Sequence, residues 1–221
     1  MKKIIIFSLL VAVGFSSCKK DYGDPSITVT ASYPTITLTG AQYYSIPVNG
    51  SLPTIAATAY DSFYHESCSV LLDLSTLDAT TAGLYAVTAS AKNKYGFIGY
   101  KTVYVGVTNE PASLDISGAY IRLATAGRVA NVSKVATGMF LTDNVGGVDI
   151  TNPATGAVVS AVFVVTSDTT LDFGSQLTSA GTLTASSETL MLVGGGASGT
   201  TLNYAIALSG FGTQVRTFVK Q

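Results

Sequence analysis

The chain has no tryptophan, a single histidine (His65) and only two cysteines, Cys18 and Cys68. Charged residues make up 11% of it, against about a quarter in typical soluble domains. An active site gathers titratable side chains in one pocket, and this chain offers few of them. It also has no Gly-x-Ser-x-Gly motif to present a nucleophilic serine beside His65. We therefore expect neither enzymatic activity nor a cofactor.

The sequence predicts no metal site and no nucleic-acid partner. His65 lies near Asp61 and Glu66, but the spacing matches no zinc motif, and a solvated loop explains the segment. Residues 143–149, DNVGGVD, carry oxygen ligands suited to Ca²⁺, but they lack the alternation and the closing Glu of an EF-hand. A hairpin turn is the simpler interpretation. No long basic segment is present, which argues against binding to nucleic acid.

No apolar run is long enough to span a membrane as a helix. The longest run lies at the N-terminus. After Met1, Lys2 and Lys3, the run from Ile4 to Val13 is interrupted only by Ser8. It is about as long as the core of a secretory signal and too short to span a membrane as a helix. Removing residues 1–17 leaves ten basic and thirteen acidic residues, a net charge of about −3.

Phe15-Ser16-Ser17-Cys18 follows this run and resembles the lipobox of bacterial lipoproteins. The resemblance implies a signal peptide over residues 1–17, acylation of Cys18 and a polar tether over 18–26. Several acyl chains together would hold the protein stably at a membrane. Lys-Lys-Asp after the cysteine resembles gut-type Gram-negative lipoproteins displayed on the outer membrane, so we expect an outer-membrane, cell-surface location. The alternative is an ordinary signal peptide with Cys18 as a plain thiol.

Hydroxyl and small residues are abundant: 29 Thr, 23 Ser and 22 Gly. Threonine, valine and tyrosine favour half-buried strands, while glycine supplies turns. No segment has a sustained 3.6-residue apolar period with caps, so we predict an all-β chain. If Cys18 is acylated, Cys68 is the only remaining thiol; it would form no intramolecular disulfide and would serve as a small buried residue.

The polar, proline-bearing segment Thr108 to Ala112 suggests a boundary between two domains, 27–108 and 114–221, with a linker over 109–113. The sequence LDATTAGLYAVTASAKNKYGFIGYKTVYVGV resembles bacterial immunoglobulin-like modules, which implies an N-terminal β-sandwich. Tyr85 would then form a tyrosine corner. The valines at 103, 105 and 107 would face inward, opposite Tyr100, Thr102 and Tyr104. The hairpin Asn93 to Phe97 departs from the family's Asp-x-x-Gly-Asn, which argues against a calcium-like or tight polar role there.

The second domain opens with the motif SGAY at residues 117–120 and resembles the β-rich C-terminal domains of two-domain surface lipoproteins. Adjacent strands with short turns predict an antiparallel meander, or a barrel. Open sheet and closed barrel stay equally possible at this point. Strands are expected at 119–125, 128–135, 138–142, 157–166, 180–185, 188–193, 201–209 and 214–219.

Aromatic side chains are the strongest functional signal, because sugars stack their C–H faces on aromatic rings. The strand alternation predicts exposed rings among six residues: Tyr43, Tyr44, Phe63, Tyr64, Tyr100 and Tyr104. The chain also resembles accessory lipoproteins of polysaccharide-utilisation systems. This resemblance implies a non-catalytic surface protein that captures polysaccharide beside an outer-membrane transporter. The alternative function is a structural or adhesive stalk that contacts other proteins.

Overall fold

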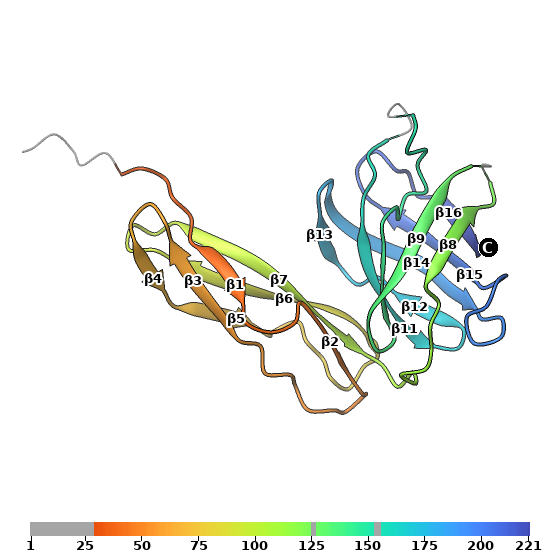
Figure 1. Cartoon of the computed structure of the whole chain (residues 1–221), viewed down its shortest axis with the longest axis horizontal. Coiled ribbons are helices and arrows are strands. Elements are labelled where there is room, and N and C mark those ends of the chain that lie inside the picture. Colours follow the sequence, from red (N-terminus) through yellow and green to blue (C-terminus); the bar gives the residue numbers. More distant parts are fainter. Residues whose placement is uncertain (1–28, 125–126, 153–155) are drawn as a thin grey trace, which may run out of the picture. The chain divides into compact units, whose positions relative to one another are not determined.

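The chain is all-β in the computed structural model, which describes residues 29–124, 127–152 and 156–221 (Figure 1). Over these residues there is no helix, and hence no helix that is long and apolar enough to cross a membrane. Ser32–Gln221 forms one compact unit. The predicted signal peptide and Cys18 lie outside the described residues.

The strands cover about half of the described chain, in keeping with its threonine, valine and tyrosine content. Their bounds are β1 Thr35–Leu38, β2 Tyr43–Ile46, β3 Ala57–Asp61, β4 Glu66–Cys68, β5 Val70–Asp73, β6 Gly83–Lys92, β7 Ile98–Val107, β8 Gly118–Arg122, β9 Val129–Ala136, β10 Met139–Thr142, β11 Ala161–Ser167, β12 Thr170–Asp172, β13 Gln176–Thr178, β14 Gly181–Met191, β15 Thr201–Ala207 and β16 Val215–Lys220.

Strands β1 to β7 form two sheets, which we call the N-terminal sheets. Their strand orders are β1-β3-β4 and β2-β7-β6-β5, and β2 runs parallel to β7. Ile36 and Ala59 from the first sheet pack against Ala89 and Ala91 from the second, so the sheets share an apolar core. The three valines of β7 predicted to face inward are fully buried, as expected. The immunoglobulin-like assignment of these sheets stays a prediction.

Tyr85 occupies the predicted tyrosine-corner position. Its hydroxyl donates a 2.9 Å hydrogen bond to the backbone carbonyl of Thr81, four residues earlier. The bond ties the segment that enters β6 to the strand itself, which is a structural role.

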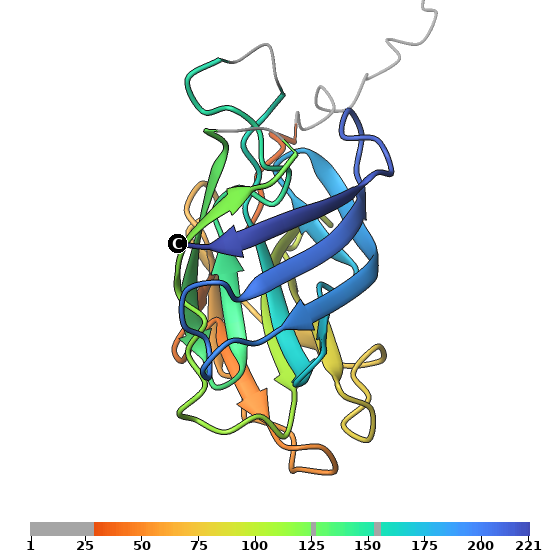
Figure 2. The ribbon, with the colours of Figure 1, turned by 90° about the vertical axis from the view of Figure 1, so that its right-hand side faces the viewer.

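Eight of the remaining strands close into a barrel in the order β8-β9-β10-β11-β12-β14-β15-β16, and β16 pairs with β8. The join between β12 and β14 is the pair Thr170↔Thr189, and β13 extends the sheet beyond β14. Figure 2 shows the blue strands β14, β15 and β16 side by side. Closure decides the question that the sequence left open, and it removes the free sheet edges of a meander.

A run of aromatic rings fills the barrel. Successive ring centroids lie 4.7–5.7 Å apart, a spacing typical of favourable aromatic pairs. All of these side chains are buried. In order of contact they are Phe140, Phe163, Phe173, Tyr204 and Phe218.

One strand prediction is wrong in detail. The segments 180–185 and 188–193 were expected to be separate strands, but β14 is continuous from Gly181 to Met191. Its register against β15 shifts between Ser186 and Thr189, and Ser187 has a φ of 56°. The apparent break in alternation is therefore a bulge within one strand.

Apolar side chains of the N-terminal sheets and of the barrel share a buried cluster. Tyr104 and Leu84 lie in it together with Met139, Val162 and Val164 of the barrel. Thr108, at the predicted boundary, is also buried and donates a 2.6 Å hydrogen bond to the carbonyl of Val165. The contact packs the outer face of β6 and β7 against the barrel.

Candidate functional site

The six aromatic residues predicted as a ligand surface do not lie together. Tyr43 and Tyr104 stack on each other with centroids 6.0 Å apart, and Tyr44 packs against the core of the N-terminal sheets. Phe63 and Tyr64 contact each other in the turn between β3 and β4. Tyr100 lies on β7. The structure thus divides the six predicted residues among four places.

The predicted exposure is confirmed for Phe63 and Tyr100, which are 56% and 67% exposed, and is wrong for Tyr104, which is 7% exposed. Alternation placed Tyr104 on the correct face of β7, opposite Val103 and Val105. That face is covered at Tyr104 by apolar side chains of the barrel. Strand periodicity fixes the face of a residue but not what packs against it.

Tyr100 lies at the edge of a hollow of about 370 Å³ between the β6–β7 surface and the β13–β14 hairpin. Leu177 on β13 is 71% exposed and lies on the same hollow. Besides Tyr100 the lining carries no ionisable side chain, and four of its other residues are threonine or serine, which bear hydroxyl groups. The lining residues are Ala86, Thr88, Tyr100, Thr102, Ser175, Gln176, Leu177 and Thr182.

The strand register explains this arrangement. Thr88 lies opposite Thr102 on the β6–β7 pair, and Tyr100 is two residues before Thr102, on the same face. The side chain of Gln176 is buried and binds both the N–H and the carbonyl of Val162. Gln176 is therefore a structural residue that fixes the start of β13, whereas the hydroxyl residues and Tyr100 are the other polar residues of the lining.

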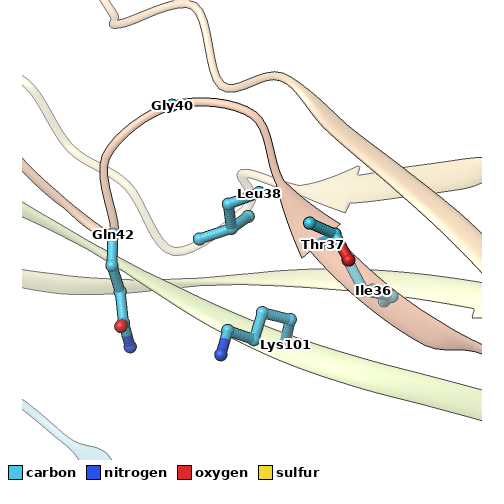
Figure 3. A pocket seen from close by; sticks show the side chains of 6 residues that line it. All are labelled: Ile36, Thr37, Leu38, Gly40, Gln42 and Lys101. Atoms are coloured by element: carbon cyan, nitrogen blue, oxygen red, sulfur yellow. The ribbon is translucent and has the colours of Figure 1, made fainter.

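A second hollow, of about 340 Å³, lies beside β1 and β7 (Figure 3). Gln42 and Lys101 line it. In Figure 3 the amide of Gln42 and the ammonium of Lys101 both lie below the side chain of Leu38. None of the six predicted aromatic residues lines this hollow. The Tyr100 hollow therefore matches the predicted chemistry better.

Asp61 and Asn93 form a buried polar pair beneath the turn that carries Phe63 and Tyr64. The Asn93 amide nitrogen donates to Asp61 Oδ2 at 2.7 Å and to the carbonyl of Ser32 at 2.9 Å. Asp61 Oδ1 accepts from the Ser32 hydroxyl and from the backbone N–H groups of Phe63 and Tyr64. Three separate segments of the chain meet at this pair.

Two expectations about this region are corrected. Asp61 was expected in a solvated loop, but it is fully buried. Burial acts to raise the pKa of Asp61, yet the hydrogen bonds from Asn93, Ser32, Tyr64 and Phe63 outweigh it and lower the pKa below its ordinary value. The hairpin of Asn93 was expected to lack a tight polar role, but Asn93 Oδ1 also accepts from the N–H groups of Tyr95 and Phe97.

The acidic and thiol groups near His65 are not arranged as a metal centre. His65 is exposed in a left-handed conformation, with a φ of 51°, and the carboxylate of Asp61 is already occupied by hydrogen bonds. Over the three described ranges, no group of three or more His, Cys, Asp and Glu residues is close enough to hold a metal. Cys68 is half-buried rather than buried, and burial, followed by the nearby Glu66 charge, raises the pKa of its thiol.

The loop that begins at Asp143 is a structured turn. Asn144 is buried, donates to the carbonyls of Val129 and Val148, and accepts from the N–H of Val148. Arg216 Nε binds the carbonyl of Gly146 at 3.2 Å. These contacts hold the loop against the barrel. It is longer than the hairpin turn that was expected, because β10 ends at Thr142 and β11 begins only at Ala161.

The sequence reasoning missed several exposed or polar residues that the fold gathers. Leu177 joins Tyr100 at the hollow, Tyr95 contacts Tyr64, and Tyr33 contacts Phe97 of the Asn93 hairpin. Tyr95-Gly96 could have indicated an exposed ring from the sequence, because a large aromatic side chain is unusual in the turn of a hairpin. Nothing local marks Leu177 or Tyr33.

Comparison with solved structures finds similarity to a bacterial lipoprotein. The chain is similar to the crystal structure of the lipoprotein BT2262 from Bacteroides thetaiotaomicron, with 20% sequence identity and a TM-score of 0.38. The similarity covers 85% of this chain and all of that one. No protein-family model and no curated protein sequence matches the chain.

Proposed function

We propose that this protein is a non-catalytic lipoprotein, anchored through Cys18 to the outer membrane and displayed on the cell surface, that captures glycans. In this proposal the N-terminal sheets are an immunoglobulin-like module and the barrel is the second domain. The polysaccharide would be passed to an outer-membrane uptake system.

The observation that carries the proposal is the position of Tyr100. Its ring is 67% exposed at the edge of a hollow lined by four hydroxyl-bearing residues. A sugar presents a flat C–H face and a rim of hydroxyl groups, so an open ring next to threonine and serine hydroxyls complements it. A binding surface, unlike an active site, needs no pair of titratable groups, and the lining supplies none.

Affinity electrophoresis tests this function. The chain from residue 18, with Cys18→Ser, is run through gels that contain soluble plant, host or microbial polysaccharides. Retardation by one of them is expected, and Tyr100→Ala should weaken binding by about 2 kcal/mol, or roughly 30-fold in Kd. Tyr60→Ala is the matched control, because Tyr60 is also exposed, at 47%, but does not line the hollow.

Unretarded migration across the panel would argue against glycan capture. If Tyr100→Ala weakens glycan binding no more than the control Tyr60→Ala does, the glycan binds elsewhere on the surface. The exposed Leu177 beside Tyr100 also suits a protein contact. The adhesive function therefore becomes the better hypothesis if cross-linking on intact cells recovers a partner protein and Leu177→Asp abolishes its capture.

A further inference from the structure

A second group of aromatic side chains is separate from the Tyr100 hollow. It is formed by the β3–β4 turn, the β6–β7 turn and the segment that leads into β1. We call it the aromatic tip; its residues are Tyr33, Phe63, Tyr64, Lys94, Tyr95 and Phe97. Tyr33, Phe63 and Tyr95 are 63%, 56% and 43% exposed. So much exposed aromatic surface in one place usually marks an interaction site.

The rings of the tip contact one another at steep angles. Phe63 and Tyr64 meet edge to face with centroids 4.9 Å apart, and Tyr64 and Tyr95 are tilted by 46° at 4.4 Å. The Lys94 ammonium lies 5.3 Å from the Tyr64 ring and 5.2 Å from the Tyr95 ring. The tip therefore offers ring edges, hydroxyl groups and an ammonium, rather than one flat face for stacking on a sugar.

The tip is also held in place from within. The buried pair Asp61–Asn93 fixes both turns, and it binds Ser32 through the serine hydroxyl and carbonyl. Ser32 is the first residue of the compact unit. The chain that comes from the N-terminus thus enters the compact unit at the base of the tip.

Residue 18 is fourteen positions before Ser32 in the sequence. A fully extended chain of that length spans at most about 50 Å. If Cys18 carries lipid, the tip is the part of the compact unit with the shortest covalent path to the membrane. The link holds the tip at a high effective concentration near the bilayer, so that even a weak contact becomes populated.

We propose that the aromatic tip contacts the headgroup region of the membrane that holds the lipid on Cys18. The proposal rests on the lipid anchor of the proposed function. Tyrosine is enriched at membrane interfaces, because its ring suits the apolar side and its hydroxyl the wet side. Lysine can extend its ammonium to the headgroups while its stem stays among the rings. Lys94 and the exposed Lys92 supply the positive charge, and Glu66 binds the backbone N–H of Lys94.

The absence of tryptophan makes the test direct, because one introduced tryptophan is the only one in the protein. The full-length chain is expressed in a bacterium that processes lipoproteins, purified from membranes and reconstituted into vesicles of phosphatidylcholine and phosphatidylglycerol. Phe63→Trp reports on the tip. Val215→Trp, at a barrel position that is 54% exposed, is the matched control. Flotation of the vesicles first establishes that the protein is anchored.

The proposal predicts a blue-shifted emission for Phe63→Trp and a loss of its fluorescence in lipids brominated near the headgroup, with neither change for Val215→Trp. Tyr95→Trp should behave as Phe63→Trp does, which guards against a local effect of one substitution. Flotation without quenching at either tip position would refute the tip contact and leave the anchor intact. Failure to float would remove the anchor and the proposal with it, while glycan binding could still be tested. Protection of the tip tryptophan on intact cells but not in vesicles would assign the tip to a protein or glycan instead.

Discussion

Asn93 makes the most consequential polar contacts of the N-terminal sheets, and Asn93→Ala tests whether they stabilise the fold. The substitution removes a 2.7 Å hydrogen bond to the buried Asp61 carboxylate and a 2.9 Å bond to the carbonyl of Ser32. A bond to a charged group is worth roughly 1.5–3 kcal/mol and a neutral one roughly 0.5–1.5 kcal/mol. Water can replace the bonds that Asn93 accepts from Tyr95 and Phe97 in the turn, so these bonds add little to the loss.

The expected loss in the free energy of unfolding is therefore roughly 2–4.5 kcal/mol. In a chain of this size it lowers the Tm by roughly 4–18 °C. The measurement is urea denaturation of the chain from residue 18 with Cys18→Ser, followed by circular dichroism and by tyrosine fluorescence. Because the chain has no tryptophan, the tyrosines report directly.

Asn131→Ala is the matched control for Asn93→Ala. The Asn131 amide nitrogen also donates to a carboxylate, that of Asp143 at 2.8 Å, but this pair is exposed to solvent. Water replaces such a bond, so a loss of no more than about 0.5 kcal/mol is expected. A loss below about 1 kcal/mol in Asn93→Ala, or equal losses in the two variants, would refute the argument that burial makes the Asn93 contacts strong.

Two further predictions concern the barrel and its contact with the N-terminal sheets. A Cβ added at Gly106 would lie 2.6 Å from Met139 Cγ and 3.1 Å from Val164 Cγ2, so Gly106→Ala should cost about 1–3 kcal/mol in urea denaturation. Combining it with Met139→Ala should cost less than the sum of the two single losses, and simple additivity would contradict the packing argument. Burial raises the pKa of Glu188 in the folded state, although its carboxylate accepts from the N–H of Phe173. The stability from this group is therefore full below its unfolded pKa of 4.5 and declines as the pH rises through the folded value. Glu188→Gln should accordingly gain stability relative to the parent chain between pH 4 and pH 7, and a pH-independent difference would contradict this.

Much of the fold follows from local features of the sequence. The hydroxyl-rich, β-branched composition predicts an all-β chain, and alternation places the β7 valines on the buried face. The turn before Tyr85 and the ring itself predict the hydrogen bond to Thr81. Each of these features depends on residues close together in the sequence, where backbone geometry and side-chain periodicity act directly.

The candidate site was only partly predictable. Tyr100 was identified as an exposed ring, since alternation puts it on the face opposite the valines. Its partner Leu177 comes from β13, and no local pattern relates the two. The burial of Tyr104 and the burial of Asp61 were both mispredicted, because each depends on a segment distant in the sequence, the barrel in one case and Asn93 in the other.

The sequence by itself determined the fold class, the faces of the strands and the scarcity of catalytic side chains, because composition and periodicity are properties of neighbouring residues. Only the tertiary structure decided that the barrel closes, through the pairing of β12 with β14. It alone brought Tyr100 to a hydroxyl-lined hollow and gathered the aromatic tip over Asp61 and Asn93. These outcomes depend on which strand faces meet, and that choice is made by the packing of side chains far apart in the chain.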